Sequence, residues 1–219
     1  MGLGAVKLKD TREYVRIVRA LLNRETTEWE FEGKRRKIRF LNPDLELINT
    51  TDPIPFHFSA LGPKGKKLAA ETGMNWIMPI RDNDGAITQL RAMQDEWRGA
   101  GRDTADLYAT AHAGGCILGP DEPADSARAK AQAGPAAAMV LHDMVEAEFF
   151  GTLGYKIPET LRPLLEEYKL IYEAYKPEDA RYLSVHRGHL MVLRPEEEHM
   201  IGGELIKALS FTATGPELR

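Results

Sequence analysis

The chain has 219 residues, of which 43% are apolar and 28% are charged, so its length and composition fit a single globular domain. Its net charge of −4 and its lack of any apolar run near the ~20 residues of a membrane-spanning helix argue against nucleic acid and membrane as partners. The N-terminal residues lack the apolar core of a signal peptide, which predicts a cytoplasmic protein, and the single cysteine, Cys116, excludes an internal disulfide and a cysteine-based metal cage.

The first elements that the pattern predicts are a helix and a strand pair. Apolar residues recur at three- and four-residue spacing from Tyr14 to Leu22, which is typical of an amphipathic helix. Alternation then follows on both sides of Gly33, with Trp29 and Phe31 on one side. This segment, residues 28–41, is interpreted as a hairpin that leaves the main fold.

A strand, a helix and a second strand are expected next. The strand begins at Phe56, the helix begins near Pro63, and the second strand covers residues 75–80. Another amphipathic helix follows, and residues 107–120 are strand-like, although their adjacent glycines indicate a bulge or a close backbone approach. This alternation favours a parallel sheet with crossover helices.

The middle of the chain departs from this rhythm and is predicted to be helical. We expect an Ala-rich helix from near Asp125, a separate apolar helix behind Gly134 and Pro135, and a helix with a Leu and Tyr stripe from Leu161 to Tyr175.

The C-terminal part is expected to contain three elements. Residues 182–194 are predicted to be extended, residues 195–209 helical, and residues 209–212 a short strand.

The corner between the strand and the helix, residues 60–65, has the composition of an anion site. Pro63 suits the first helical position, because its missing N–H would have no partner there. The N–H groups left without an intrahelical carbonyl are those of Leu61, Gly62, Lys64 and Gly65. The helix dipole adds partial positive charge at this end, and the glycines let an oxygen-rich group approach the backbone. The pattern predicts a phosphate site supported by Lys64, Lys66 and Lys67; the alternative is an ordinary turn whose lysines face water.

Five segments follow one another as they do in the luciferase-like monooxygenases, which the chain resembles over residues 10–219. The segments are TREYVRIVRALLNRET, WEFEGKRRKIRF, PIPFHFSALGPKGKKLAAETG, WRGAGRD and FTATGPEL. This family consists of oxidoreductases that depend on FMN or a deazaflavin and is built on a (β/α)8 barrel. The resemblance therefore implies an α/β fold of the TIM-barrel family, a flavin-dependent oxidoreductase or monooxygenase, and a small-molecule substrate.

In this family the corner lies at the barrel mouth and binds the cofactor phosphate through backbone donors. The cofactor-binding residues that the resemblance implies are Ser59, Ala60, Leu61, Gly62, Lys64 and Gly65. One departure follows the helix, where Gly73, Met74 and Asn75 replace the usual Ala-Asp-Gly and remove a carboxylate.

The resemblance also implies an incomplete barrel. We expect one partial-barrel domain over residues 1–219 with a long helical insertion at 121–181, lacking the N-terminal strands and the last strand of the family. Unpaired strand edges would favour a homo-oligomer. The alternative to an enzyme is a non-catalytic fragment or oligomerising module of the same family.

A histidine and a glutamate four residues apart could bind a metal. His142 and Glu146 share one face of a predicted helix, but the spacing supplies no third ligand, so we interpret them as surface charge and expect no metal site. A metal-dependent hydrolase that uses the histidines is a further alternative.

Three residues are candidates for catalysis, although the sequence assigns none. His186 and Arg187 belong to the motif HRGH, which ends at His189, and Arg187 could neutralise a phosphate or a substrate carboxylate. His112 lies on the Gly-rich strand, where a side chain near the barrel mouth could meet the flavin ring or the substrate.

Overall fold

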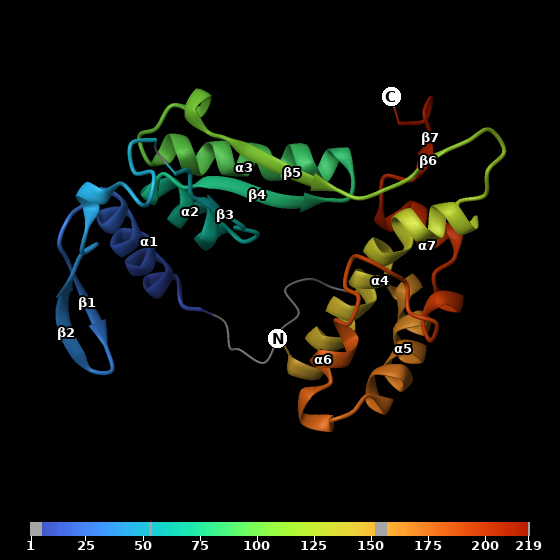
Figure 1. The fold of residues 1–219 in the computed structure, drawn as a ribbon. Coiled ribbons are helices and arrows are strands. Elements are labelled where there is room, and N and C mark those ends of the chain that lie inside the picture. The colour runs from blue at the N-terminus through green and yellow to red at the C-terminus, as the bar shows by residue number, and fades with distance from the viewer. Residues whose placement is uncertain (1–5, 53, 152–156, 219) are drawn as a thin grey trace. The chain divides into compact units, whose positions relative to one another are not determined.

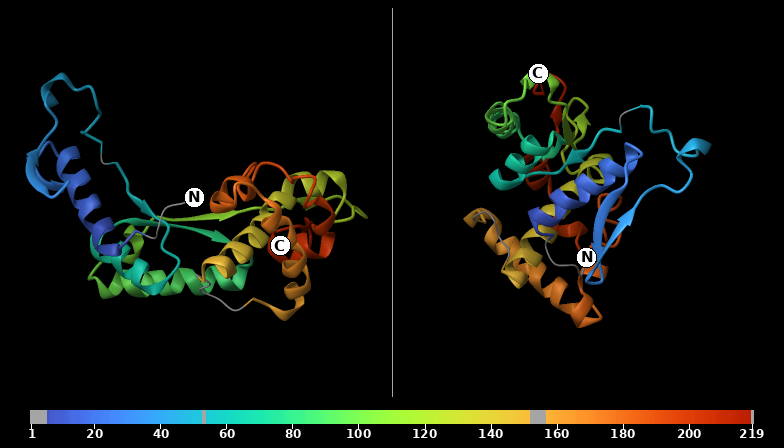
Figure 2. Two further views of the ribbon diagram at one scale, coloured as in Figure 1. Left: turned by 90° about the horizontal axis from the view of Figure 1, so that it is seen from below. Right: turned by 90° about the vertical axis from the view of Figure 1, so that its left-hand side faces the viewer.

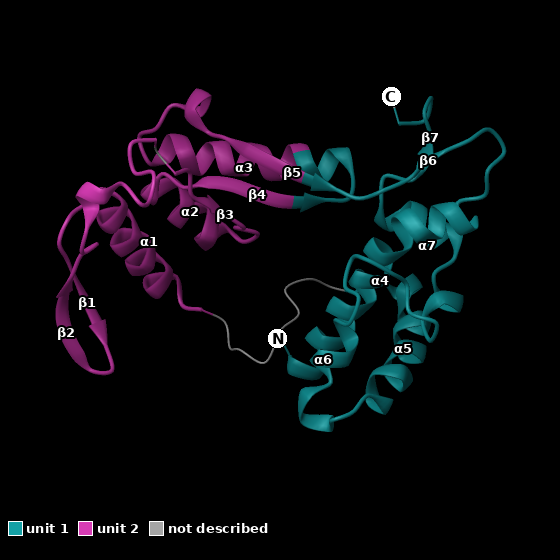
Figure 3. Cartoon of the chain, viewed as in Figure 1, with its two compact units in different colours: residues 1–3, 79–86, 112–219 teal, residues 4–78, 87–111 magenta. Residues whose placement is uncertain are grey.

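The computed structural model describes residues 6–52, 54–151 and 157–218 (Figure 1). Its internal contacts divide the chain into two compact units (Figure 3). We call residues 4–78 and 87–111 the sheet unit, and residues 1–3, 79–86 and 112–219 the helical unit. Residues 152–156, which belong to the predicted insertion, lie outside the described part of the chain.

The sheet unit begins with a helix and a hairpin. Helix α1 (Leu8–Leu22) contacts strand β1 (Thr27–Phe31), which pairs antiparallel with β2 (Lys34–Ile38). The two strands are joined by Glu32 and Gly33, whose φ angles of 52° and 69° fit a tight hairpin turn. The predicted strand pair around Gly33 is therefore present.

The strand-helix-strand order predicted from residue 56 is confirmed. Strand β3 (His57–Phe58) leads into helix α2 (Pro63–Thr72), and β4 (Asn75–Ile80) then pairs parallel with β3. Helix α3 (Asn83–Gly99) and strand β5 (Ala109–Ala113) follow, and the sheet has the order β3-β4-β5.

Buried apolar side chains from α2, β4, α3 and the turn between α2 and β4 contribute to the core of the sheet unit. They are Leu68, Ala69, Ala70, Met74, Trp76, Met78, Met93 and Trp97. The fold is thus mixed α/β, as expected, and the described residues form small sheets without closing a barrel.

A close backbone approach follows β5. The strand-like stretch is interrupted after Ala113 and resumes as β6 (Ile117–Leu118), which pairs parallel with β7 (Ala213–Thr214). A Cβ atom at Gly115 would lie 2.1 Å from the Phe211 carbonyl oxygen, so only glycine fits there. The close approach predicted from the glycines is confirmed. The short strand predicted at residues 209–212 is instead displaced to residues 213–214, where β7 lies.

The helical unit is built around one long helix. Helix α4 (Ala127–Phe150) contacts α5 (Arg162–Ala174) and α7 (Gly203–Leu209), as the further views also show (Figure 2). The prediction of two helices separated at Pro135 is wrong, because α4 continues through this residue. Pro135 is buried within the apolar core of the unit, and that packing offsets the hydrogen bond that proline cannot donate.

The predicted extended segment at 182–194 is also wrong. It forms the short helix α6 (Tyr182–Val185) followed by turns, with φ angles of 74° at Gly188 and 59° at Leu190. The apolar residues that suggested a strand include Met191 and Val192, which are exposed.

Short 3-10 turns complete the described structure. They are Pro43–Leu45, Thr104–Asp106, Glu159–Leu161, Glu178–Ala180 and Glu198–Met200. The last of these turns and α7 occupy the segment that was predicted to be one helix, residues 195–209. Among the described helices, none has both the length and the apolar composition needed to cross a bilayer.

Candidate functional site

The corner between β3 and α2 presents free backbone donors. Within the described residues, no acceptor is found for the N–H groups of Leu61, Gly62, Lys64 and Gly65. The first N–H of the helix that is satisfied is that of Lys66, which donates to the Gly62 carbonyl. Leu61, Gly62 and Lys64 are exposed, so an anion can reach these donors from solvent.

Contacts with β4 and within the strand-to-helix turn hold the corner in place. Ala60 is buried, and its carbonyl oxygen accepts a hydrogen bond of 2.9 Å from the Trp76 indole N–H on β4. A Cβ atom at Gly65 would lie 3.3 Å from the Cβ of Ala60, so this glycine lets α2 pack against the end of the strand. A Cβ atom at Gly62 would have nothing within 4 Å, so Gly62 borders open space.

The two ends of α2 differ in whether side chains bind their free backbone groups. At the C-terminal end, the Arg102 Nε donates to the Ala70 carbonyl at 2.6 Å, and the Arg19 guanidinium donates to the carbonyls of Thr72 and Gly73. These cations complement the negative end of the helix dipole. The N-terminal end, in contrast, has no side-chain cap.

The prediction that Lys66 adds charge at the corner is wrong. Its side chain is buried, its Nζ donates to the Gln89 side chain on α3, and the amine lies 5.5 Å from the centre of the Trp76 ring. Lys66 projects from the face of α2 that packs on the core, whereas Lys64 and Lys67 remain exposed.

The catalytic candidates lie in the helical unit. His112 is exposed on β5. The side chain of Arg187 is 73% exposed and lies 3.8 Å from a Glu196 carboxylate oxygen. His186 is partly buried, and its Nε2 forms a hydrogen bond of 2.9 Å with Glu146. The corner lies in the sheet unit, so these residues and the corner belong to different units.

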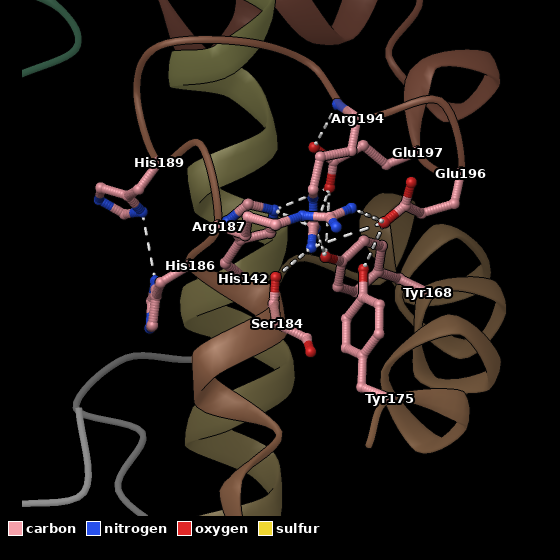
Figure 4. Close-up of polar contacts among 10 residues, drawn as sticks. All are labelled: His142, Tyr168, Tyr175, Ser184, His186, Arg187, His189, Arg194, Glu196 and Glu197. Carbon is pink, nitrogen blue, oxygen red and sulfur yellow. Dashed lines mark hydrogen bonds and ion pairs between the residues drawn. The ribbon is translucent and has the colours of Figure 1, made fainter. Parts of the chain in front are cut away.

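A buried ionic cluster that the sequence did not predict surrounds His142 (Figure 4). Arg194 is ion-paired with Glu197, and its Nη2 also donates to the Tyr168 hydroxyl at 2.6 Å. The His142 Nε2 lies 2.9 Å from a Glu197 carboxylate oxygen. Only 3% of Arg194 and 1% of Glu197 are exposed, so the pair is desolvated. The interpretation of His142 as surface charge is therefore wrong.

The cluster fixes the charge of its members. Burial raises the pKa of Glu197, but hydrogen bonds from His142 and Arg194 outweigh burial and lower it to about 2. Burial lowers the pKa of Arg194, yet the bond to Glu197 makes the net shift upward. Burial raises the pKa of Tyr168, which stays a neutral donor.

Comparison with known proteins identifies the family. The family model described as luciferase-like monooxygenase matches residues 6–198. The chain belongs to the luciferase-like monooxygenase family. A search of the curated proteins found none that matches it.

Membership in the luciferase-like monooxygenase family indicates an oxidoreductase that uses a reduced flavin cofactor in general. The corner fits the phosphate of such a cofactor, because its free donors are exposed and the space at Gly62 is open. Arg194, in contrast, bonds to Glu197 and Tyr168 and is only 3% exposed, so a ligand phosphate cannot reach it from solvent.

Proposed function

We propose that the chain is a flavin-dependent oxidoreductase that binds the phosphate of FMN or a deazaflavin coenzyme at the corner, residues 60–65. The observation that carries the proposal is the set of free, exposed N–H groups at the start of α2. Lys64, exposed at the same helix end, adds positive charge next to these donors.

In this activity the chain binds and orients the cofactor. The cofactor supplies the hydride or oxygen chemistry. The corner holds its phosphate, and the Trp76 bond to Ala60 keeps the corner backbone in a fixed position. We also propose that the substrate is a small molecule, that the chain forms a homo-oligomer and that it is located in the cytoplasm.

Comparison of FMN with riboflavin tests the phosphate assignment. Riboflavin lacks the phosphate but keeps the ring system, and each hydrogen bond to a charged group contributes about 1.5–3 kcal/mol. Two such bonds predict that FMN binds at least ~100-fold more tightly than riboflavin, measured by fluorescence quenching. The same comparison is made with a deazaflavin coenzyme and its phosphate-free form. Equal affinities within each pair would overturn the phosphate site.

The alternative is an oligomerising, non-catalytic module of the family. Strand β5 lies at the edge of its sheet, and all of its residues except Thr110 are exposed. Such an edge can pair with a second chain. An oligomer that binds none of the flavins would favour this alternative.

A further inference from the structure

Three histidines of the helical unit converge on one point. One ring nitrogen from each of His142, His186 and His189 lies within 4.8 Å of one from each of the others. His142 comes from the middle of α4, and the other two come from the turns that follow α6 (Figure 4). The His142 ring centre lies 6.3 Å from that of each of the other two rings. The folded chain therefore supplies the further ligands that sequence spacing could not.

The contacts of His142 show which nitrogen is free. Nη2 of Arg194 has two protons, and its bonds to Glu197 and the Tyr168 hydroxyl use both, although it also lies 3.1 Å from the His142 Nε2. The His142 Nε2 must then donate to the Glu197 carboxylate. The proton therefore resides on Nε2, and the lone pair is on Nδ1.

His186 repeats this arrangement. Its Nε2 lies 2.9 Å from a carboxylate oxygen of Glu146, one turn after His142 on α4. A carboxylate accepts the proton of this nitrogen, which leaves a lone pair on Nδ1. Histidines that bind metals commonly donate their second ring N–H to a carboxylate, which orients the ring and strengthens the ligand.

The Nδ1 atoms of the three histidines are not all satisfied by hydrogen bonds within the described residues. The Nδ1 of His142 is buried and has no hydrogen-bond partner in the part of the chain that the structure describes. The Nδ1 atoms of His186 and His189 lie 3.2 Å apart, so one of them must carry a proton to bond the other. Because the His186 Nδ1 carries a lone pair, that proton belongs to the His189 Nδ1. If the His189 proton moves to its Nε2, a cation can bind the lone pairs of all three Nδ1 atoms together.

We propose that His142, His186 and His189 form a site for a divalent transition metal ion such as Zn²⁺. Three neutral imidazoles suit such an ion, and a fourth position would remain for water. The Glu146 and Glu197 carboxylates orient two of the ligands and add negative charge around the cation. His186 is partly exposed, with 24% of its side chain accessible, which gives the ion a route from solvent. This proposal does not rest on flavin binding at the corner.

Metal titration of the full chain, first freed of metal with a chelator, tests the proposal. We expect one equivalent of Co²⁺ to bind with the visible absorption of a low-coordinate nitrogen site, and Zn²⁺ to displace it. His189→Ala should weaken Zn²⁺ binding at least ~10-fold, and Glu146→Gln should weaken it ~10–100-fold. The matched control is His199→Ala, which removes an exposed histidine that also pairs with a glutamate. Absence of uptake by the wild-type chain, or equal affinity in wild type and His189→Ala, would overturn the site.

A second measurement needs no substitution. Imidazole ¹⁵N NMR of the wild-type chain follows each ring nitrogen as Zn²⁺ is added. The proposal requires the Nδ1 signals of His142, His186 and His189 to shift together at one equivalent, while those of His199 stay unchanged. Shifts confined to other histidines would contradict it.

Discussion

The substitution Gly62→Asp separates phosphate binding from folding. Gly62 is the residue before α2, with φ −96° and ψ 164°, a conformation open to any residue, and an added Cβ would meet nothing within 4 Å. Aspartate is favoured at this helix position, and its charge near the helix N-terminus contributes about 0.3–1 kcal/mol. The free energy of unfolding should therefore stay constant or rise slightly.

The same substitution, Gly62→Asp, should weaken the binding of FMN. The new carboxylate would compete for the free N–H groups and would repel the phosphate. With one charge facing two at ~5 Å, the repulsion is about 1.7 kcal/mol in a water-like dielectric and rises to about 7 kcal/mol near a protein surface. Because the corner is exposed, the lower value applies, and affinity for FMN should fall at least ~15-fold.

The assay pairs flavin titration with urea unfolding. Gly202→Asp is the matched control, because Gly202 precedes α7 in a similar extended conformation and a Cβ there also meets nothing within 4 Å. Gly202→Asp should leave FMN affinity unchanged, and Gly62→Asp should leave riboflavin affinity nearly unchanged. Unaltered FMN affinity in a folded Gly62→Asp chain would refute the reasoning.

Three further predictions concern the fold and the corner. Glu197→Gln should lower the free energy of unfolding by about 3–5 kcal/mol at neutral pH, because it breaks a buried ion pair. The pKa of Glu197 is depressed in the folded chain, so its contribution to the free energy of unfolding is present above pH 4.5 and is lost as the pH falls toward about 2. The free energy of unfolding of the variant, measured with urea, should lack this dependence on pH. Gly115→Ala should cost about 1–3 kcal/mol in thermal unfolding, because its Cβ would meet a carbonyl at 2.1 Å, whereas Gly99→Ala, with nothing within 4 Å, should be neutral or stabilising. Lys64→Gln should weaken FMN binding a few-fold at low salt, whereas Lys66→Met should not; the reverse order would contradict the placement of both side chains.

The elements around the corner could be predicted because their signals are local. Gly62 and Pro63 mark the start of α2 within two residues, and the apolar runs on either side have the lengths of strands. The wrong prediction for Lys66 has a related cause. Its sequence position next to the corner suggests a further charge there, but the helical period places Lys66 on the core face with Ala69 and Ala70.

The wrong predictions for the helical unit concern residues whose structure depends on tertiary packing, which the local sequence pattern does not reveal. Proline normally ends a helix, yet Pro135 lies within α4 because the surrounding residues are buried in the core of the unit. The apolar sequence around Leu190 and Met191 is typical of a strand. The turn at Gly188 and the hydrogen bond from Arg194 to the Ser184 carbonyl instead fold this segment back on itself.

The histidine cluster shows why this kind of site escapes a sequence reading. At the corner, the donors are backbone groups of consecutive residues, so six positions suffice to define the site. His142, in contrast, gains its partners from Glu197, 55 residues away, and from the turns that contain His186 and His189. Spacing on α4 did place His142 and Glu146 on one face, but it could not reveal that Glu146 holds another histidine rather than a metal. A site whose ligands come from separate segments becomes visible only when the tertiary contacts specify which nitrogen of each ring is already occupied.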